Sequence, residues 1–271
     1  MRTLHVLSFF VAASMVAACG SDPADGAGGA GGTGSAQGGA ASTGGAAQGG
    51  ASSQGGAGQG GATSQGGAGQ GGGTGAPTAA ELLAKVANCD PVSTSGYKTD
   101  DEAGLPANID ICGLPGAVFW KADMDVDCDG KETTECNLST DPAFYPATSA
   151  TDSNGDPLDA AALPFVVIPL PSSRFDYSAA GIELGAVVAV IYDGKVEYGV
   201  FGDEGPNSII GEASYAMASS LGIDPDPSFG GVDSGVTYIV FTGSNAVVSP
   251  IESHDAAVTL GQSLASSLLA Q

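Results

Sequence analysis

The chain has 271 residues and carries 30 acidic against 7 basic side chains, a formal net charge of −23. So negative a balance excludes nucleic acid as a natural partner, because binding to phosphates needs the opposite sign. It permits plain solubility, a calcium-rich surface or a cationic ligand.

Residues 1–18 are predicted to be a lipoprotein signal peptide. A short, weakly basic start precedes an apolar run at 6–18 that is too short to span a membrane stably. The run ends in "VAAC" at 16–19, which resembles a bacterial lipobox. We therefore expect a secreted protein of the cell envelope, exposed at the surface and held to a membrane by lipid on Cys19, without a transmembrane helix. An ordinary signal peptide with a chance cysteine is the alternative.

Residues 19–76 are predicted to be a disordered tether rich in Gly, Ala, Gln and Ser. The nonapeptide "SQGGAGQGG" occurs at 53–61 and again at 64–72. The segment has no aromatic residue and no periodic apolar pattern, so it cannot repay the entropy of ordering. Residues 77–271 are then left as one globular domain of ordinary size, which we expect to be a monomer.

Four further cysteines are expected to form two disulfide bonds in an oxidising compartment: Cys89, Cys112, Cys128 and Cys136. Four cysteines allow three pairings. Because Cys128 and Cys136 bracket a polar loop, we favour that pair together with Cys89–Cys112. A zinc site is disfavoured, since no CxxC spacing occurs and His254 is the only histidine of the domain. We expect no metal and no other cofactor.

The stretch "AVFWKADMDVDCDG" at 117–130 has the pattern of a strand, in which alternate side chains face opposite ways. One face then carries an apolar stripe from Val118 to Cys128. The other face carries four carboxylates about 6.6 Å apart, which we call the aspartate row: Asp123, Asp125, Asp127 and Asp129. Like charges so arranged repel unless something positive offsets them.

Three interpretations of the aspartate row remain open: a wall that binds a cationic ligand, a calcium site, or a solvated edge. The "DVDCDG" at 125–130 begins like an EF-hand loop. However, Cys136 stands where that loop requires a bidentate Glu, and no flanking helices are evident.

The remaining pattern is mostly that of strands. We predict a buried strand at 163–169, a hairpin at 185–203 around Asp193-Gly194, a helix at 212–223 ending at Gly222, a strand at 235–241, and a closing helix at 253–269 capped by Ser253 or Asp255. The expected fold class is α+β and β-rich. Its core is a compact mixed or antiparallel sheet, or a barrel-like arrangement, with a few short helices and a disordered linker before it.

Residues 202–214, "GDEGPNSIIGEAS", carry carboxylates at both ends of a Gly/Pro-rich bend. Strict alternation places Asp203 at the end of a strand, on the same face as Glu197 and Phe201, and Glu212 at the start of the helix. Hydrolysis of a glycosidic bond requires two carboxylates held apart in this manner. The alternative is that Asp203 caps a turn and Glu212 complements the helix dipole.

Four segments resemble, in this order, the fungal-type chitosanases of glycoside hydrolase family 75: "ADMDVDCDG", "PLDAAALPFVVIP", "GAVVAVIYDGKVEYGVFGDEGPNSIIGEAS" and "GVTYIVF". The resemblance implies an inverting endo-hydrolase of β-1,4-linked glucosamine polymers, so that chitosan, a cationic polysaccharide, is the implied partner. By motif, the essential Asp and Glu of the family fall on Asp203 and Glu212. The loop between them is shorter than in many fungal members.

The resemblance also implies roles for these side chains. Glu212 is expected to be the general acid with a raised pKa, and Asp203 the base that activates a water, with Glu204 as the second choice of base. A non-catalytic calcium-binding or glycan-binding module is the second class of function left open. The expected substrate-binding residues are Asp123, Asp125, Asp127, Glu197 and Tyr215.

Overall fold

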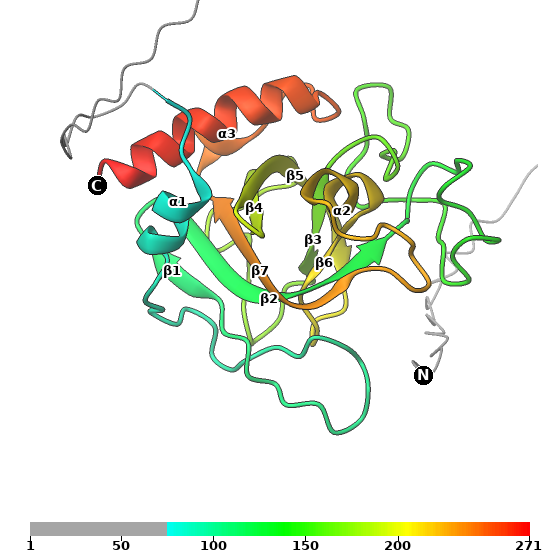
Figure 1. The fold of residues 1–271 in the computed structure, drawn as a ribbon, viewed down its shortest axis with the longest axis horizontal. Coiled ribbons are helices and arrows are strands. Elements are labelled where there is room, and N and C mark those ends of the chain that lie inside the picture. Colours follow the sequence, from blue (N-terminus) through cyan, green and yellow to red (C-terminus); the bar gives the residue numbers. More distant parts are fainter. Residues whose placement is uncertain (1–74) are drawn as a thin grey trace, which may run out of the picture. The chain divides into compact units, whose positions relative to one another are not determined.

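A computed structural model describes residues 75–271 and shows seven strands in one mixed sheet, with three α-helices around it (Figure 1). The predicted signal peptide, lipidation site and tether lie outside the described residues, apart from the last two tether positions. The strands are β1 (Cys112–Leu114), β2 (Ala117–Asp127), β3 (Phe165–Pro169), β4 (Val187–Tyr192), β5 (Lys195–Gly205), β6 (Glu212–Ser214) and β7 (Val232–Phe241). The helices are α1 (Ala79–Lys85), α2 (Tyr215–Leu221) and α3 (His254–Leu269), with a 3₁₀ turn at Ser244–Ala246.

The sheet closes into a barrel. Its strand order is β1-β2-β6-β3-β5-β4-β7, and β7 also pairs with β2, so that strands β2 to β7 form a ring with β1 outside it. The pairs β2–β6 and β3–β5 are parallel, and the other pairs are antiparallel. The expected β-rich fold with a barrel-like core and a few short helices is thereby confirmed.

The hairpin of β4 and β5 forms around the predicted two-residue turn. Asp193 and Gly194 have φ angles of 45° and 76°, the two positive values that a type I′ turn requires. Tyr192 lies opposite Lys195 at the base of this turn, and the pairing continues to Val187 opposite Val200. The returning strand β5 then extends beyond β4 to Gly205, which takes Asp203 past the end of the hairpin.

The predicted helix at 212–223 starts later than expected, at Tyr215. Glu212 to Ser214 instead form the short strand β6, because they pair with β2 on one side and with β3 on the other. Ser214 ends the strand and caps α2, since its Oγ accepts the Met217 N–H at 3.2 Å. Gly222, with φ 79°, is the C-cap that the sequence predicted.

A β-bulge in β5 changes the direction of Asp203. Along β3, the partner of Val166 is Phe201, but the partner of the next residue, Val167, is Asp203, so Gly202 is an extra residue in β5. The expectation that Phe201 and Asp203 share a face is therefore wrong. Phe201 points into the barrel, and Asp203 lies on its outer side.

The interior of the barrel is filled by side chains from all six ring strands. Trp120 stacks on Tyr238 there, with ring centroids 5.3 Å apart. The predicted apolar stripe of β2 joins this interior cluster, except for Cys128, which lies beyond the end of the strand and packs on the outer side. The other members of the stripe in the interior are Val118, Ala122, Met124 and Val126.

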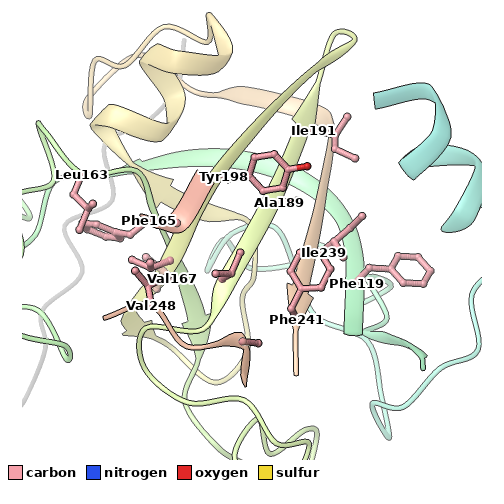
Figure 2. Packing of buried hydrophobic residues seen from close by; sticks show 14 of the residues in the cluster. Phe119, Leu163, Phe165, Val167, Ala189, Ile191, Tyr198, Ile239, Phe241 and Val248 are labelled. Atoms are coloured by element: carbon pink, nitrogen blue, oxygen red, sulfur yellow. The ribbon is translucent and has the colours of Figure 1, made fainter. Parts of the chain in front are cut away.

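A second apolar cluster lies on the outer face of the barrel, where residues of α1 and α3 join it. Figure 2 shows some of its side chains. It includes Phe119, Phe165, Ala189, Tyr198 and Phe241. The helix α3 begins after Ser253, whose Oγ accepts the Ala256 N–H, so the first of the two predicted caps is confirmed. Only part of the outer face is covered by the helices, and the aspartate row lies further along β2 on this same face.

The two disulfide bonds are those that the sequence favoured. Cys89–Cys112 joins the segment after α1 to β1, and Cys128–Cys136 closes the loop that follows β2. Within residues 75–271, no helix is both long and apolar enough to cross a membrane.

Candidate active site

Six carboxyl groups form one cluster on the outer face of the barrel, from β2 and the segment just after it, from β5 and from β6. We call it the carboxylate cluster: the aspartate row, Asp203 from β5 and Glu212 from β6. The parallel pairing of β2 with β6 places Asp125 opposite Glu212. Electrostatic interactions join Glu212 to Asp125, Asp129 and Asp203, and join Asp203 to Asp127. The structure thus brings the row and the predicted catalytic pair into one site.

Gly205 shows how Asp203 and Glu212 are spaced. A Cβ atom on Gly205 would lie only 2.8 Å from Oε2 of Glu212, so the Glu212 carboxyl occupies the space that a larger side chain would fill. Gly205 follows Asp203 by two residues on the same strand, a step of about 6.6 Å. The carboxyl of Glu212 therefore lies beside β5 about one such step beyond Asp203.

Glu212 has the properties of a proton donor at neutral pH. Burial, and after it the neighbouring carboxylates of Asp125, Asp129 and Asp203, raise its pKa to about 8. Each of these charges disfavours a negative charge on Glu212. The side chain is nevertheless half-exposed, so a substrate atom can reach it.

Asp203 is held differently from Glu212. Its Oδ1 atom accepts three hydrogen bonds, from the backbone N–H and the Oγ–H of Ser149 at 2.8 and 2.7 Å, and from the Glu204 N–H at 2.7 Å. Burial raises the pKa of Asp203, whereas these bonds lower it because they stabilise the ionised form. Its Oδ2 atom takes part in none of the three bonds.

Glu204 faces away from this pair. Its Oε1 accepts the Tyr177 O–H at 2.6 Å, and the ring of Tyr177 packs edge-on against Phe201 of the barrel interior. The side chains of Asp203 and Glu204 thus lie on opposite sides of β5. This arrangement favours Asp203 over Glu204 as the base.

Asp123 is the most enclosed member of the aspartate row. It is 6% exposed, and its Oδ1 has no hydrogen-bond partner. Burial, together with the charges of Asp125, Glu212 and Asp100, raises its pKa to about 8. The Oδ1 atom lies against Gly211, whose φ is 121° and whose position has no room for a Cβ.

The other members of the row are half-exposed and partly tied to the backbone. Asp127 Oδ1 accepts the Asp129 N–H at 2.8 Å, and Asp129 Oδ1 accepts the Tyr145 N–H at 2.7 Å. Burial raises the pKa of Asp127, and raises that of Asp129 to about 7. Because several pKa values are raised together, the cluster holds protons at neutral pH when nothing positive is bound.

The structure places the last two predicted substrate-binding residues apart from each other. Tyr215 directly follows β6, three residues from Glu212, and is partly buried against the outer cluster. Glu197 lies six residues before Asp203 on β5, roughly 20 Å away along the strand. Its Oε1 lies 2.9 Å from Nε2 of His254 at the start of α3. Glu197 is therefore not brought into the carboxylate cluster.

Two residues of the site had no signal in the sequence. Ser149 is 54 residues from its partner Asp203, in a stretch without a periodic pattern. Gly205 stands among many other glycines, and its importance depends on the position of Glu212. In the described part of the chain, no group of three His, Cys, Asp or Glu side chains is placed to hold a metal ion.

Comparison with known proteins gives a consistent result. Residues 124–268 match a family described as fungal chitosanase of glycosyl hydrolase group 75. Endo-chitosanase B of Aspergillus oryzae is 33% identical over 180 residues, which cover 60% of this chain and 75% of that protein. Endo-chitosanase C of Aspergillus oryzae is 39% identical over 49% of this chain and 34% of its own length. An endo-chitosanase of Aspergillus fumigatus is 29% identical over 59% of this chain and 72% of its own length.

Proposed function

Because the chain belongs to the fungal chitosanase family of glycosyl hydrolase group 75, we propose that it hydrolyses internal β-1,4 bonds of chitosan with inversion at the anomeric carbon. The observation that carries this proposal is the pairing of Asp203 with Glu212. One carboxyl of the pair has its pKa raised to about 8, and the other accepts three hydrogen bonds that favour its ionised form. With the family known, a non-catalytic module is not favoured.

In the proposed mechanism, Glu212 donates its proton to the oxygen of the leaving sugar as the glycosidic bond breaks. Asp203 accepts a proton from a water that attacks the anomeric carbon from the opposite face. Inverting enzymes keep their two carboxyls about 6.5–9.5 Å apart to leave room for this water. The Glu212 carboxyl lies beside Gly205, two residues beyond Asp203 on β5, and the inverting mechanism expected of the family requires the two carboxyls to lie in that range.

The proposed substrate matches the charge of the site. Chitosan carries protonated amines near or below neutral pH, and the half-exposed Asp125 and Asp127 offer carboxylates beside the catalytic pair. A bound amine offsets the repulsion within the cluster, so it favours ionisation of carboxyls whose pKa values are raised in the free protein. Asp123 is buried beneath the same site and adds one more carboxyl group to it.

The direct test is to incubate the protein with chitosan and with chitin and to follow the release of reducing ends. We expect hydrolysis of chitosan into oligomers, with the first product carrying the α configuration in a proton NMR spectrum. A β product would contradict inversion, and intact chitosan would contradict the proposed function.

Substitution of Asp125 or Asp127 by Asn should raise KM for chitosan by about two- to fivefold, the range of a partly exposed ion pair. Added sodium chloride should produce the same change by screening the attraction. Asp255→Asn, which removes the same charge from the exposed start of α3, serves as the control and should leave KM unchanged. EDTA should change neither activity nor Tm. A lower Tm in EDTA would instead indicate a bound metal, by linkage to folding.

We also propose that the protein is secreted and lipid-anchored through Cys19, as a monomer. The support for the anchor is the "VAAC" motif at the end of the apolar run. The protein made in a bacterial host should partition into the detergent phase and show an acylated N-terminal peptide by mass spectrometry. Cys19→Ser should move it to the aqueous phase, and an aqueous wild-type protein would contradict the anchor.

A further inference from the structure

We propose that Ser149 is a positioning residue for the hydrolysis, which holds one oxygen of Asp203 so that the other is presented to the attacking water. This inference rests on the proposed role of Asp203 as the base. The two hydrogen bonds from Ser149 reach the same atom, Oδ1, from the backbone N–H and from the side-chain O–H. Two donors from one residue therefore fix the position of this oxygen atom.

The Ser149 hydroxyl also connects Asp203 to the backbone beyond it. Its Oγ accepts the Glu204 N–H at 3.2 Å while it donates to Asp203 Oδ1 at 2.7 Å. The Glu204 N–H reaches Oδ1 itself at 2.7 Å. Ser149 Oγ, Glu204 N and Asp203 Oδ1 thus form a closed set of contacts, and a carboxylate in such a set has little freedom to rotate.

Hydrogen bonds hold the backbone on both sides of Ser149. Ala150 donates its N–H to the carbonyl of Gly202, the extra residue of the bulge, at 3.0 Å. Thr148 Oγ1 donates to the Ala150 carbonyl at 2.7 Å and accepts the Leu158 N–H at 2.9 Å. Ser149 is therefore held next to the bulge at Gly202 that turns Asp203 outward.

The charges around Asp203 explain why such a donor is needed. Asp127 and Asp129 approach it from the end of β2, Glu212 from β6, and Glu204 from its own strand. All four are acidic, and each opposes ionisation of Asp203. Ser149 comes from the loop and supplies hydrogen-bond donors that favour the ionised form required of a base.

Ser149→Ala removes the hydroxyl and keeps the backbone N–H bond. Because a hydrogen bond to a charged group is lost, we expect the acidic limb of the kcat/KM pH profile to move up by about one pH unit. We also expect kcat at the optimum to fall roughly tenfold, since a misplaced base costs rate, while KM stays within about twofold, because no substrate contact is removed. Ser149→Thr keeps a hydroxyl and should restore most of the lost rate and the original limb.

Ser153→Ala is the matched control, because Ser153 also donates its N–H and its Oγ–H to a carboxylate, that of Glu252, outside the cluster. It should leave the profile unchanged. An unshifted acidic limb in Ser149→Ala, with active wild type and control, would overturn the role of Ser149 and leave the proposed function standing. If the wild type fails to hydrolyse chitosan, the proposed function fails instead. Carbon-13 NMR titration tests the effect of Ser149 on Asp203 independently of hydrolysis: the pKa of Asp203 should be higher in Ser149→Ala than in the wild type, and an equal pKa would overturn the inference.

Discussion

Replacing Glu212 by Gln, or Asp203 by Asn, is expected to lower chitosan hydrolysis by about 10²–10⁴-fold, the range for loss of a general acid or base. Each substitution is nearly isosteric and removes the group that gives or takes the proton. The loss should appear in kcat more than in KM, because the proton transfers occur in the transition state. Initial rates of reducing-end release at several chitosan concentrations measure both constants.

Glu204→Gln is the matched control for this pair. Glu204 adjoins Asp203 in the chain, but its carboxylate binds the Tyr177 hydroxyl on the other side of β5. The variant should keep most of the activity. If Asp203→Asn keeps more than about a tenth of the wild-type rate, while Glu204→Gln loses it, then Glu204 is the base. A similar residual rate in Glu212→Gln would remove Glu212 as the acid.

The free energy of unfolding is expected to fall as the pH rises from about 4 to about 8. Asp123 and Glu212 have pKa values raised to about 8 from ordinary values of 3.8 and 4.5, so the folded protein binds more protons than the unfolded chain between these limits. The stability they contribute is fully present below pH 4 and is lost as the pH rises through 8. For Asp123, which is 6% exposed, the change is on the order of 3 kcal/mol after allowance for protons shared within the cluster.

Asp123→Asn should remove a large part of this dependence. The amide has no proton to lose, so the variant should be more stable than the wild type at pH 9 and show a smaller difference between pH 5 and pH 9. Urea unfolding at several pH values measures this directly. Asp255→Asn is the control at an exposed site on α3 and should keep the wild-type slope. A wild-type stability that rises from pH 5 to pH 9 would contradict the raised pKa values.

Local patterns in the sequence predicted those parts of the fold that depend on neighbours in the chain. The β4–β5 hairpin follows from its Asp-Gly turn, and α3 from its periodicity and cap. The faces of β2 follow from strict alternation, which holds along the whole strand. The motif that holds Asp203 and Glu212 was also recognisable, because both residues lie within 202–214.

The rest of the site depends on pairings between distant segments. The bulge at Gly202 exists only in the register of β5 against β3, so alternation within β5 assigned Asp203 to the wrong face. Strand β6 has three residues, and it becomes a strand through its pairing with β2 rather than through its own pattern. The contact of Ser149 with Asp203 spans 54 residues and has no local signature.

Helices α1 and α3 come from opposite ends of the described chain and pack together beside the start of β2 (Figure 1). The Gln271 side chain approaches to 3.9 Å of the position where Gly116, just before β2, would carry a Cβ. Asp125 lies roughly 26 Å further along that strand. A solid support or a fusion partner joined at Gln271 would thus hold the barrel by the end remote from its carboxylates. The face with the carboxylate cluster would then stay open to a polymer much longer than the protein.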